Sequence, residues 1–380
     1  MPVPASSSLL LYADSVHNPD MRYFSGLSVP DAFIAFRAKG KTYGIFNALE
    51  FGRALKEAAL DVVLPFEPLR DRAKQRWPES SPGPAEIVMV AAERFELGPC
   101  LVAEDFPAGL FEKLRSRGLT VAIADGPLLP QREIKTAAEA RAIRDSNRIS
   151  AAGIGAAEAV LKKSTIEAGK LVFRGAPLTS ERLKFAIDTA CLEAGGVSVD
   201  TIAAGGNQAC DPHNRGTGPL RANQLIIVDV FPRSNRSGYY GDMTRTFLKG
   251  RASEAQRALV DAVATAQKKA LGLIRDGVSG KEVHRACVET FTGRGFETKS
   301  TPKGSVGFFH GTGHGLGLAI HELPRVSGMA DSTLRTGAVV TVEPGLYYPG
   351  LGGCRIEDVV QVTPARPKML SSFHYDWEIR

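Results

Sequence analysis

The chain lacks the features that define several classes of protein. It has only five cysteines among 380 residues, widely spaced and with no CxxC pair. An odd, scattered set argues against a disulfide framework or a cysteine-bound metal, and it favours a reducing compartment. The N-terminal stretch has no basic region before its short apolar run, and no apolar segment is long enough to span a bilayer. We therefore expect a cytoplasmic protein without a membrane segment.

The charge pattern gives little support to nucleic-acid binding. The formal net charge is +6 and the isoelectric point is near 9.0, but acidic residues are interspersed and there is no Lys/Arg run. Such a pattern is typical of a solvated surface of mixed charge. With 43% hydrophobic and 23% charged residues, the chain has an ordinary globular composition, and 380 residues allow two domains.

The first third of the chain alternates short apolar segments with helical ones. The strands that we expect are 31–38, 41–47, 60–65, 86–92, 99–104 and 119–125. This alternation predicts an α/β domain. It holds a single histidine, His17, and no cluster of metal ligands. Because residues 126–135 read as a linker, we expect an N-terminal domain over 1–130 and a second domain over 131–380.

The second domain has an order that repeats. Two helices, 136–163 and 179–196, precede strand-like segments, and two more helices, 253–277 and 279–295, precede further strand-like segments. Helix, helix, strands and again helix, helix, strands indicates two copies of one α+β unit, although the inference rests on order alone. A site between two such halves would draw ligands from both.

A glycine-rich stretch, 308–325, holds three of the seven histidines: His310, His314 and His321. Glycines between them leave the backbone bare, so another group can approach closely. One such histidine alone would suggest a loop or a satisfied core residue. Three at spacings of four and seven point to a site.

Four carboxylates interrupt apolar strands: Asp229, Asp242, Glu343 and Glu357. A buried carboxylate is costly unless it is paired or bound to a metal. Asp229 could instead be a turn residue, and Glu357 could form an ion pair with Arg355. If all four converge, two divalent cations would balance them, and oxygen ligands with one imidazole suit manganese, cobalt, iron or zinc.

The order of these residues resembles the dinuclear metallopeptidases of the pita-bread fold, which include methionine aminopeptidase, aminopeptidase P and prolidase. The segments GDMTRTF, HGTGHGLGLAIHE, VEPGLY and RIEDVV carry the resemblance, and NPDMRYFSGLSVPDAFI is similar to the N-terminal domain of the creatinase/prolidase branch. One departure is the connection of 13 positions between Asp229 and Asp242, which is longer than usual in that family. A longer hairpin loop would absorb it.

The resemblance implies a role for each candidate residue. The two metals, manganese first and cobalt, zinc or iron as alternatives, would be held by Asp229, Asp242, His314, Glu343 and Glu357, with Asp242 and Glu357 bridging. Glu343 would also be the general base, and His213 and His321 would be catalytic. The substrate-binding side chains would be His310, Arg325 and Arg355.

The activity implied is hydrolysis of the imide bond before proline. His310 and the additional N-terminal domain argue against methionine aminopeptidase. We expect an Xaa-Pro dipeptidase, because Arg325 could pair with the free carboxylate of a dipeptide, although it could also be a surface residue or a partner of Glu322. The alternatives are an aminopeptidase P acting on longer peptides, a metal-free hydrolase like creatinase, and a catalytically silent binding protein. The partners expected are proline-containing dipeptides or short peptides and a second copy of the chain, with no nucleic acid and no membrane.

Overall fold

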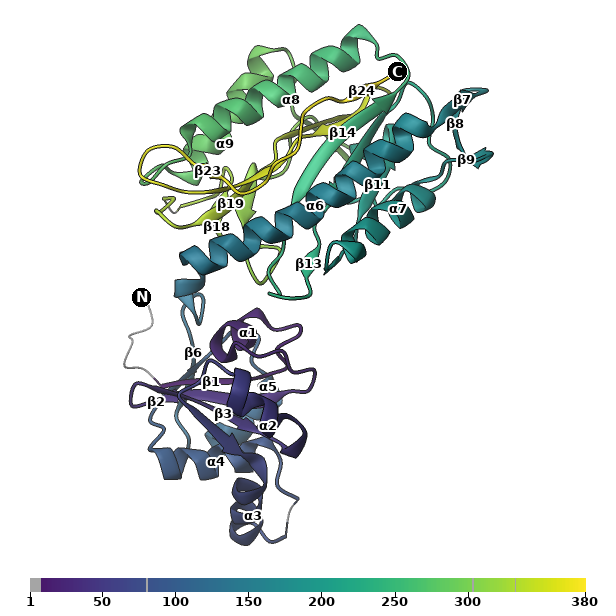
Figure 1. The fold of residues 1–380 in the computed structure, drawn as a ribbon. Helices are drawn as coiled ribbons and strands as arrows, with labels where there is room; N and C mark the ends of the chain where they lie inside the picture. The colour runs from purple at the N-terminus through teal and green to yellow at the C-terminus, as the bar shows by residue number, and fades with distance from the viewer. Residues whose placement is uncertain (1–7, 80, 303, 332) are drawn as a thin grey trace. The chain divides into compact units, whose positions relative to one another are not determined.

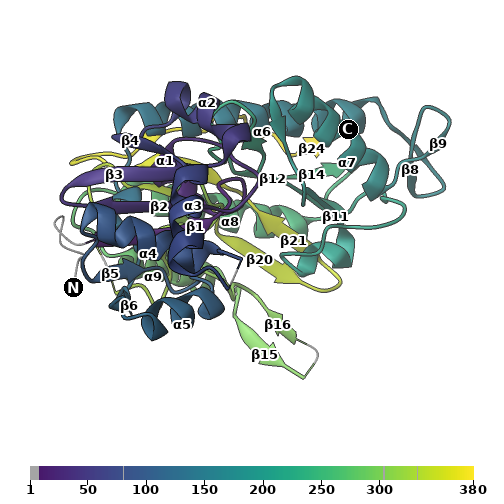
Figure 2. The ribbon, with the colours of Figure 1, turned by 90° about the horizontal axis from the view of Figure 1, so that it is seen from below.

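The computed structural model describes residues 8–79, 81–302, 304–331 and 333–380. The chain divides into two compact units, Met1–Arg132 and Glu133–Arg380, which Figures 1 and 2 show from two sides. Within the described ranges, no helix combines the length and apolar character needed to cross a membrane.

The first unit is built on one mixed sheet of six strands in the order β4-β3-β2-β1-β5-β6. Its strands are β1 (Ser8–Ala13), β2 (Phe33–Ala38), β3 (Lys41–Phe46), β4 (Val62–Pro65), β5 (Cys100–Val102) and β6 (Val121–Ile123). The helices are α1 (Pro19–Ser25), α2 (Ala48–Glu57), α3 (Phe66–Arg76), α4 (Pro84–Phe95) and α5 (Ala108–Ser116), followed by a short 3-10 turn, η1 (Pro130–Glu133). The α/β alternation expected for this part of the chain is confirmed in outline.

One expected strand is wrong: residues 86–92 belong to helix α4. The apolar run is buried on nearly every side of the helix, so it has no period that separates helix from strand. The helix signal lies just before it. Pro84 occupies the first turn, and the Glu86 carboxylate accepts the Gly83 backbone N–H at 2.9 Å, an arrangement that starts helices.

The second unit contains two pairs of helices. They are α6 (Ala137–Lys163) with α7 (Ser180–Glu193), and α8 (Glu254–Leu273) with α9 (Gly280–Gly293). Capping boxes at Thr136 and Ser253 start α6 and α8, and the side chains of Thr179 and Ser279 cap α7 and α9. Figure 1 shows the strands of this unit lying between the two helix pairs.

Two sheets fill the space between the helix pairs, in the orders β11-β12-β14-β24 and β18-β17-β19-β22-β23. The strands of the first are β11 (Ile202–Gly205), β12 (Leu225–Val230), β14 (Met243–Lys249) and β24 (Glu378–Ile379); those of the second are β17 (Gly313–Gly315), β18 (Glu322–Val326), β19 (Val339–Val342), β22 (Asp358–Gln361) and β23 (Lys368–Met369). A hairpin of β20 (Gly345–Tyr348) and β21 (Gly352–Arg355) connects β19 to β22. The order helix pair, sheet, helix pair, sheet confirms the expected α+β arrangement.

The second unit also contains several short strands and a 3-10 turn. They are β7 (Thr165–Glu167), β8 (Lys170–Phe173), β9 (Ala176–Pro177), β10 (Gly196–Val197), β13 (Arg233–Ser234), β15 (Lys299–Thr301), β16 (Gly304–Val306) and the 3-10 turn η2 (Gly206–Cys210). The longer connection between Asp229 and Asp242 contains β13, which pairs with β10. Figure 2 shows the β15–β16 hairpin projecting from the body of the unit.

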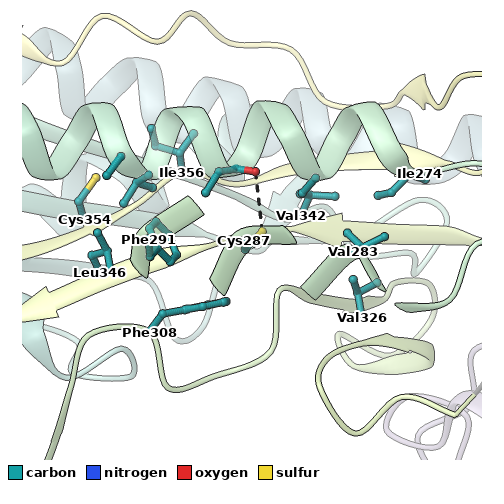
Figure 3. Packing of buried hydrophobic residues seen from close by; sticks show 14 of the residues in the cluster. Ile274, Val283, Cys287, Phe291, Phe308, Val326, Val342, Leu346, Cys354 and Ile356 are labelled. Atoms are coloured by element: carbon teal, nitrogen blue, oxygen red, sulfur yellow. Dashed lines mark hydrogen bonds between the residues drawn. The ribbon is translucent and has the colours of Figure 1, made fainter. Parts of the chain in front are cut away.

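The largest apolar cluster joins α8 and α9 to the second sheet. Figure 3 shows Phe291 and Phe308 packed beside Leu346 and Cys354, and the Cys287 thiol lies 3.7 Å from the Ala266 carbonyl oxygen. All five cysteines are free thiols, and burial raises the pKa of Cys287 and Cys354 to about 12. They therefore act as small apolar residues that hold the sheet carrying the site.

Candidate metal centre and substrate cavity

Strand ends bring five potential ligands toward one point. Asp229 lies on β12 opposite Thr244 of β14, and Asp242 immediately precedes β14. His314 is the central residue of β17, and Glu343 follows β19 directly. Glu357 lies between β21 and β22.

The closest of these groups are within reach of a single cation. Ligand atoms of Asp242, His314 and Glu357 all lie within 4.8 Å of one another, and all three residues are buried. His314 Nε2 is 3.3 Å from Glu343 Oε1 and 3.7 Å from Asp242 Oδ2. Burial is the main cause of the raised pKa values of Asp242, Glu343 and Glu357, and the negative charge of Asp229 raises them further, so Asp229 belongs to the same electrostatic cluster.

The two oxygens of the Asp229 carboxylate lie in different environments. Its Oδ2 accepts a hydrogen bond from Arg355 Nη2 at 2.5 Å. Its Oδ1 is buried and has no hydrogen-bond partner within the described ranges. A buried carboxylate oxygen without a partner is costly, so this atom fits a metal ligand. The ion pair that Arg355 makes is with Asp229, whereas the sequence suggested one with Glu357.

These carboxyl groups are buried together, so a bound cation would stabilise their ionised form. Burial raises the pKa of Asp242 and Glu357 well above the usual range, and the negative charges of Asp229 and Glu343 add to the effect on both. Burial likewise raises the pKa of Glu343 to about 7. Carboxylates out of water repel one another when ionised, so the donor set is chemically suited to divalent cations.

The histidine of the cluster is prepared for metal binding. Burial lowers the pKa of His314 to about 4, so its ring is neutral at pH 7. Its Nδ1 lies 3.0 Å from the Gly315 carbonyl oxygen and must carry the hydrogen. Nε2 is then the free lone pair, and it faces the carboxylates, as in metal-ligating histidines.

Bare backbone makes this packing possible. A Cβ at Gly313 would lie 2.0 Å from the Thr341 carbonyl oxygen, and one at Gly315 would lie 2.1 Å from that of Leu323. Strand β17 can therefore fit between β18 and β19 only with glycine on both sides of His314. This is the close approach that the glycine-rich stretch predicted.

The sequence did not identify the residues that hold the ligands in place. Thr244 Oγ1 donates to Glu357 Oε2 at 2.7 Å, and Thr341 Oγ1 lies 3.3 Å from Glu343 Oε1 and accepts the His314 backbone N–H at 3.0 Å. The Asp242 N–H donates to the buried amide of Asn147 at 3.1 Å. For Asn147, the signal available in the sequence was a polar residue on the apolar, buried face of helix α6.

A cavity of about 950 Å³ opens onto this cluster. Each candidate residue from the sequence lines it: His213, Asp229, Asp242, His310, His314, His321, Arg325, Glu343, Arg355 and Glu357. Other lining residues include Phe231, Phe309 and Ile320. The structure thus brings together every position that the sequence selected, while their chemical roles stay predictions.

His310 belongs to a chain of hydrogen bonds that fixes its tautomer. Its Nδ1 is 2.7 Å from the Gly311 carbonyl oxygen, so that nitrogen carries the hydrogen. Its Nε2 then accepts from the Tyr347 hydroxyl at 2.8 Å, and Tyr347 in turn accepts from Arg355 Nη1 at 3.0 Å. Burial lowers the pKa of His310 to about 3, so it is a neutral wall of the cavity.

The remaining candidates differ in how firmly they are held. The His321 ring lies edge-on to His314 with centroids 4.4 Å apart. The residue is exposed, and partial desolvation of its ring lowers its pKa to about 4. His213 is exposed on the loop after η2. Arg325 pairs with His314 in the β17–β18 register, and its charge lowers the pKa of His314 and His321.

The chain is similar in sequence to known metallopeptidases. The sequence model described as metallopeptidase family M24 matches residues 141–364. A segment of 173 residues is 36% identical to the Xaa-Pro dipeptidase of Pyrococcus furiosus and covers 45% of this chain and 47% of that protein. The matched segment therefore spans about half the length of such curated relatives.

Solved structures show the same fold over almost the whole chain. Prolidase from Pyrococcus furiosus superposes with a TM-score of 0.77 and 24% identity, covering 97% of both chains. An X-Pro aminopeptidase from Thermotoga maritima superposes with a TM-score of 0.80 and 21% identity, covering 98% of this chain and 97% of the other. At these identities the likeness establishes the pita-bread fold.

Proposed function

The chain belongs to metallopeptidase family M24, and from that premise we propose that it hydrolyses the imide bond of Xaa-Pro dipeptides. One observation carries the proposal: His314 and four carboxylates meet at a cavity, with one buried Asp229 oxygen that no described group satisfies. Similarity to an Xaa-Pro dipeptidase supports the choice of substrate.

The metal ligands in this proposal are Asp229, Asp242, His314, Glu343 and Glu357. When bound, two divalent cations supply Lewis acidity that polarises the scissile carbonyl and lowers the pKa of the attacking water. Manganese is the metal that we propose, because hard oxygen donors with one imidazole suit it, and the same set accepts cobalt, zinc or iron.

Glu343 takes the proton of the attacking water and returns it to the leaving nitrogen. Its carboxylate borders the cavity, where a group that exchanges a proton with the substrate has to lie. Thr341 hydrogen-bonds the same carboxylate. Glu343 is therefore the residue whose loss should affect the rate most.

His321 and His213 act on the substrate from the cavity wall. His321 is neutral at pH 7, so it can donate one hydrogen bond to developing charge on the carbonyl oxygen without carrying a net charge. His213 lies on an exposed loop that lines the same cavity. Both are proposed as catalytic residues.

The proline ring is proposed to pack between His310 and the aromatic residues beside it. His310 is a neutral ring hydrogen-bonded to Tyr347, and the Phe309 ring lies tilted against the Tyr347 ring with centroids 5.4 Å apart. The dipeptide carboxylate would be met by Arg325, whose guanidinium offers a planar fork for it. Arg355, which is buried against Asp229, contributes positive charge behind the site.

Aminopeptidase P activity is the second candidate, and the size of the cavity favours it. A volume of about 950 Å³ lies near the upper end of the range of about 300–1,000 Å³ for small-molecule sites. This is more room than a dipeptide needs. The proposal also includes a homodimer and a cytoplasmic location, the latter supported by free, buried thiols.

The test is turnover by the purified, metal-loaded protein of Ala-Pro, Ala-Pro-Ala and Ala-Ala, with metal content measured on the same sample. We expect Ala-Pro to be cleaved fastest and Ala-Ala least. Faster cleavage of Ala-Pro-Ala would replace the dipeptidase with the aminopeptidase. Preference for Ala-Ala would contradict the proline specificity, and full turnover without metal would contradict the metal site.

A further inference from the structure

The C-terminal segment of residues 371–376 lies against β14 and β22, next to Glu357. Arg245 of β14 makes several of the contacts, with a side chain only 3% exposed. Its guanidinium donates to the carbonyl oxygens of Phe373 at 3.0 Å and His374 at 3.1 Å, and it lies 4.6 Å from the centre of the Tyr375 ring. The same guanidinium donates to the Glu357 carbonyl oxygen at 2.6 Å.

Asp358, the neighbour of Glu357, is saturated by donors from three elements. Its Oδ1 accepts from Arg245 at 3.0 Å and from Ser371 at 2.8 Å, and its Oδ2 accepts from Gln267 at 2.7 Å and Tyr375 at 2.8 Å. Two of these four donors, Ser371 and Tyr375, come from the C-terminal segment. The position of the carboxylate is thus set in part by that segment.

Three hydrogen bonds hold Glu357 itself in place. Its N–H donates to the Thr244 carbonyl oxygen at 3.1 Å, its own carbonyl accepts from Arg245, and its Oε2 accepts from Thr244 Oγ1 at 2.7 Å. Thr244 and Arg245 are adjacent on β14. A shift of the Arg245 guanidinium would therefore act directly on the Glu357 backbone carbonyl.

The C-terminal segment is anchored at its other side by α6. His374 Nε2 lies 3.2 Å from Glu158 Oε2, and the Phe373 ring is 3.7 Å from where a Cβ of Gly155 would be. Helix α6 also holds Asp242 through Asn147. The segment therefore contacts both α6, which holds Asp242 through Asn147, and Arg245, which holds the Glu357 backbone.

A contribution to global stability does not explain this arrangement well. A buried ion pair such as Arg245–Asp358 adds little stability compared with apolar residues of the same size, and its attested benefit is to specify geometry. The geometry specified here is that of Glu357.

We propose that residues 371–376 are a positioning element of the metal centre, acting on Glu357 through Asp358 and Arg245. The inference rests on the proposed function, because it takes Glu357 as a metal ligand. Outer-shell partners typically change metal affinity by about 10–100-fold. Since Tyr375 acts one residue further out, we expect its hydroxyl to contribute about three- to tenfold.

The experiment removes that hydroxyl and measures metal binding directly. Chelated, full-length wild type and Tyr375→Phe are titrated with Co²⁺, following its visible absorption, and with Mn²⁺ by calorimetry. Ser371→Ala tests the opposite oxygen of Asp358. Both variants should bind about three- to tenfold more weakly and show a changed Co²⁺ spectrum, at a temperature far below unfolding.

Tyr348→Phe is the matched control. Its hydroxyl donates to the Glu297 carbonyl oxygen at 2.7 Å, and its side chain is absent from the residues lining the cavity. It should bind both metals as wild type does. If Tyr375→Phe and Ser371→Ala bind like wild type, or if Tyr348→Phe loses as much affinity, the positioning role is wrong. Wild type that binds neither metal would instead overturn the proposed metal site.

Discussion

The Lys135 ammonium forms an ion pair with the Glu322 carboxylate at 2.8 Å, and both side chains are almost completely buried, with 1% of Lys135 and 7% of Glu322 exposed. Its other oxygen accepts the Ala319 backbone N–H at 2.9 Å. Glu322 follows His321 directly, so this ion pair fixes the turn on which that histidine sits. The sequence had suggested Arg325 as a partner of Glu322, but Arg325 lines the cavity.

Lys135→Met should lower the free energy of unfolding by about 3–5 kcal/mol, because removing one partner leaves a buried charge without compensation. Urea unfolding measures it. The control is Arg285→Met, which breaks an exposed pair with Glu289 and should cost about 0.3–0.5 kcal/mol. A loss below about 1 kcal/mol for Lys135→Met would place this pair among ordinary surface pairs.

Asp242→Asn should abolish turnover and reduce bound metal while the protein stays folded. The aspartate is buried among carboxylates, so an amide removes a ligand charge and also removes repulsion. The metal-free variant should therefore unfold at a higher temperature than metal-free wild type at pH 8. The chelated wild type should regain activity with Mn²⁺ or Co²⁺. If Asp242→Asn retained full metal content and rate, Asp242 could not be a bridging ligand.

The stability of the metal-free protein should fall as the pH rises from about 7.5 to 8.5. In this window the histidines are almost wholly neutral in both the folded and the unfolded chain, because it lies above their ordinary pKa of about 6.5. The carboxyls of Glu343, Asp242 and Glu357 have raised pKa values in the folded state. The folded state therefore binds more protons than the unfolded state, so stability decreases with pH. Metal-loaded protein should show a flatter profile in calorimetric melts at matched pH, whereas a metal-free melting temperature that rises across this window would contradict the buried cluster.

Glu343→Gln should reduce kcat by about 10²–10⁴-fold, the usual contribution of a general base. The amide oxygen can still bind a metal, so metal affinity should change much less than rate. Parallel measurement of single-turnover rate and of metal content separates the two effects. Thr341→Val removes the hydroxyl near Glu343 Oε1 and should have a smaller effect on rate. A near-normal rate for Glu343→Gln would remove its assignment as base.

Much of this site was predictable because its ligands interrupt strong local patterns. A carboxylate after the apolar run of β12, or after that of β19, is conspicuous in sequence, and so are glycines on both sides of His314. The fold of the second unit followed from helix caps such as Thr136 and Ser253, which are local signals.

What the sequence could not reveal depends on contacts between distant segments. Lys135 and Glu322 are 187 positions apart, and Arg245 meets the chain again 129 positions later at His374. No periodicity encodes such pairs. The prediction of a strand over 86–92 was wrong for another reason: the run is apolar from Ile87 to Ala92, so burial on nearly all sides hid the helical period of α4.

Arg325 should decide between dipeptidase and aminopeptidase. It lies opposite His314 in the strand register and lines the cavity, and we propose that it meets the end of the substrate beyond the scissile bond. A dipeptide presents a carboxylate there, whereas a longer peptide presents a neutral amide. Hydrogen bonds to charged groups contribute about 1.5–3 kcal/mol. Arg325→Ala should therefore lower kcat/KM for Ala-Pro by about ten- to a hundredfold and leave Ala-Pro-Ala almost unchanged.

Arg325→Lys tests whether the geometry of the guanidinium matters as well as its charge. Lysine keeps the charge but lacks the fork that pairs with both carboxylate oxygens, so it should recover only part of the Ala-Pro activity. Arg215→Ala is the control for a general loss of positive charge, because Arg215 lines the same cavity but forms an exposed pair with Asp200. It should affect both substrates alike. If Arg325→Ala lowered kcat/KM equally for both substrates, the arginine would not be the residue that recognises the dipeptide carboxylate. The dipeptidase assignment would then lose its structural basis, and the large cavity would favour aminopeptidase P.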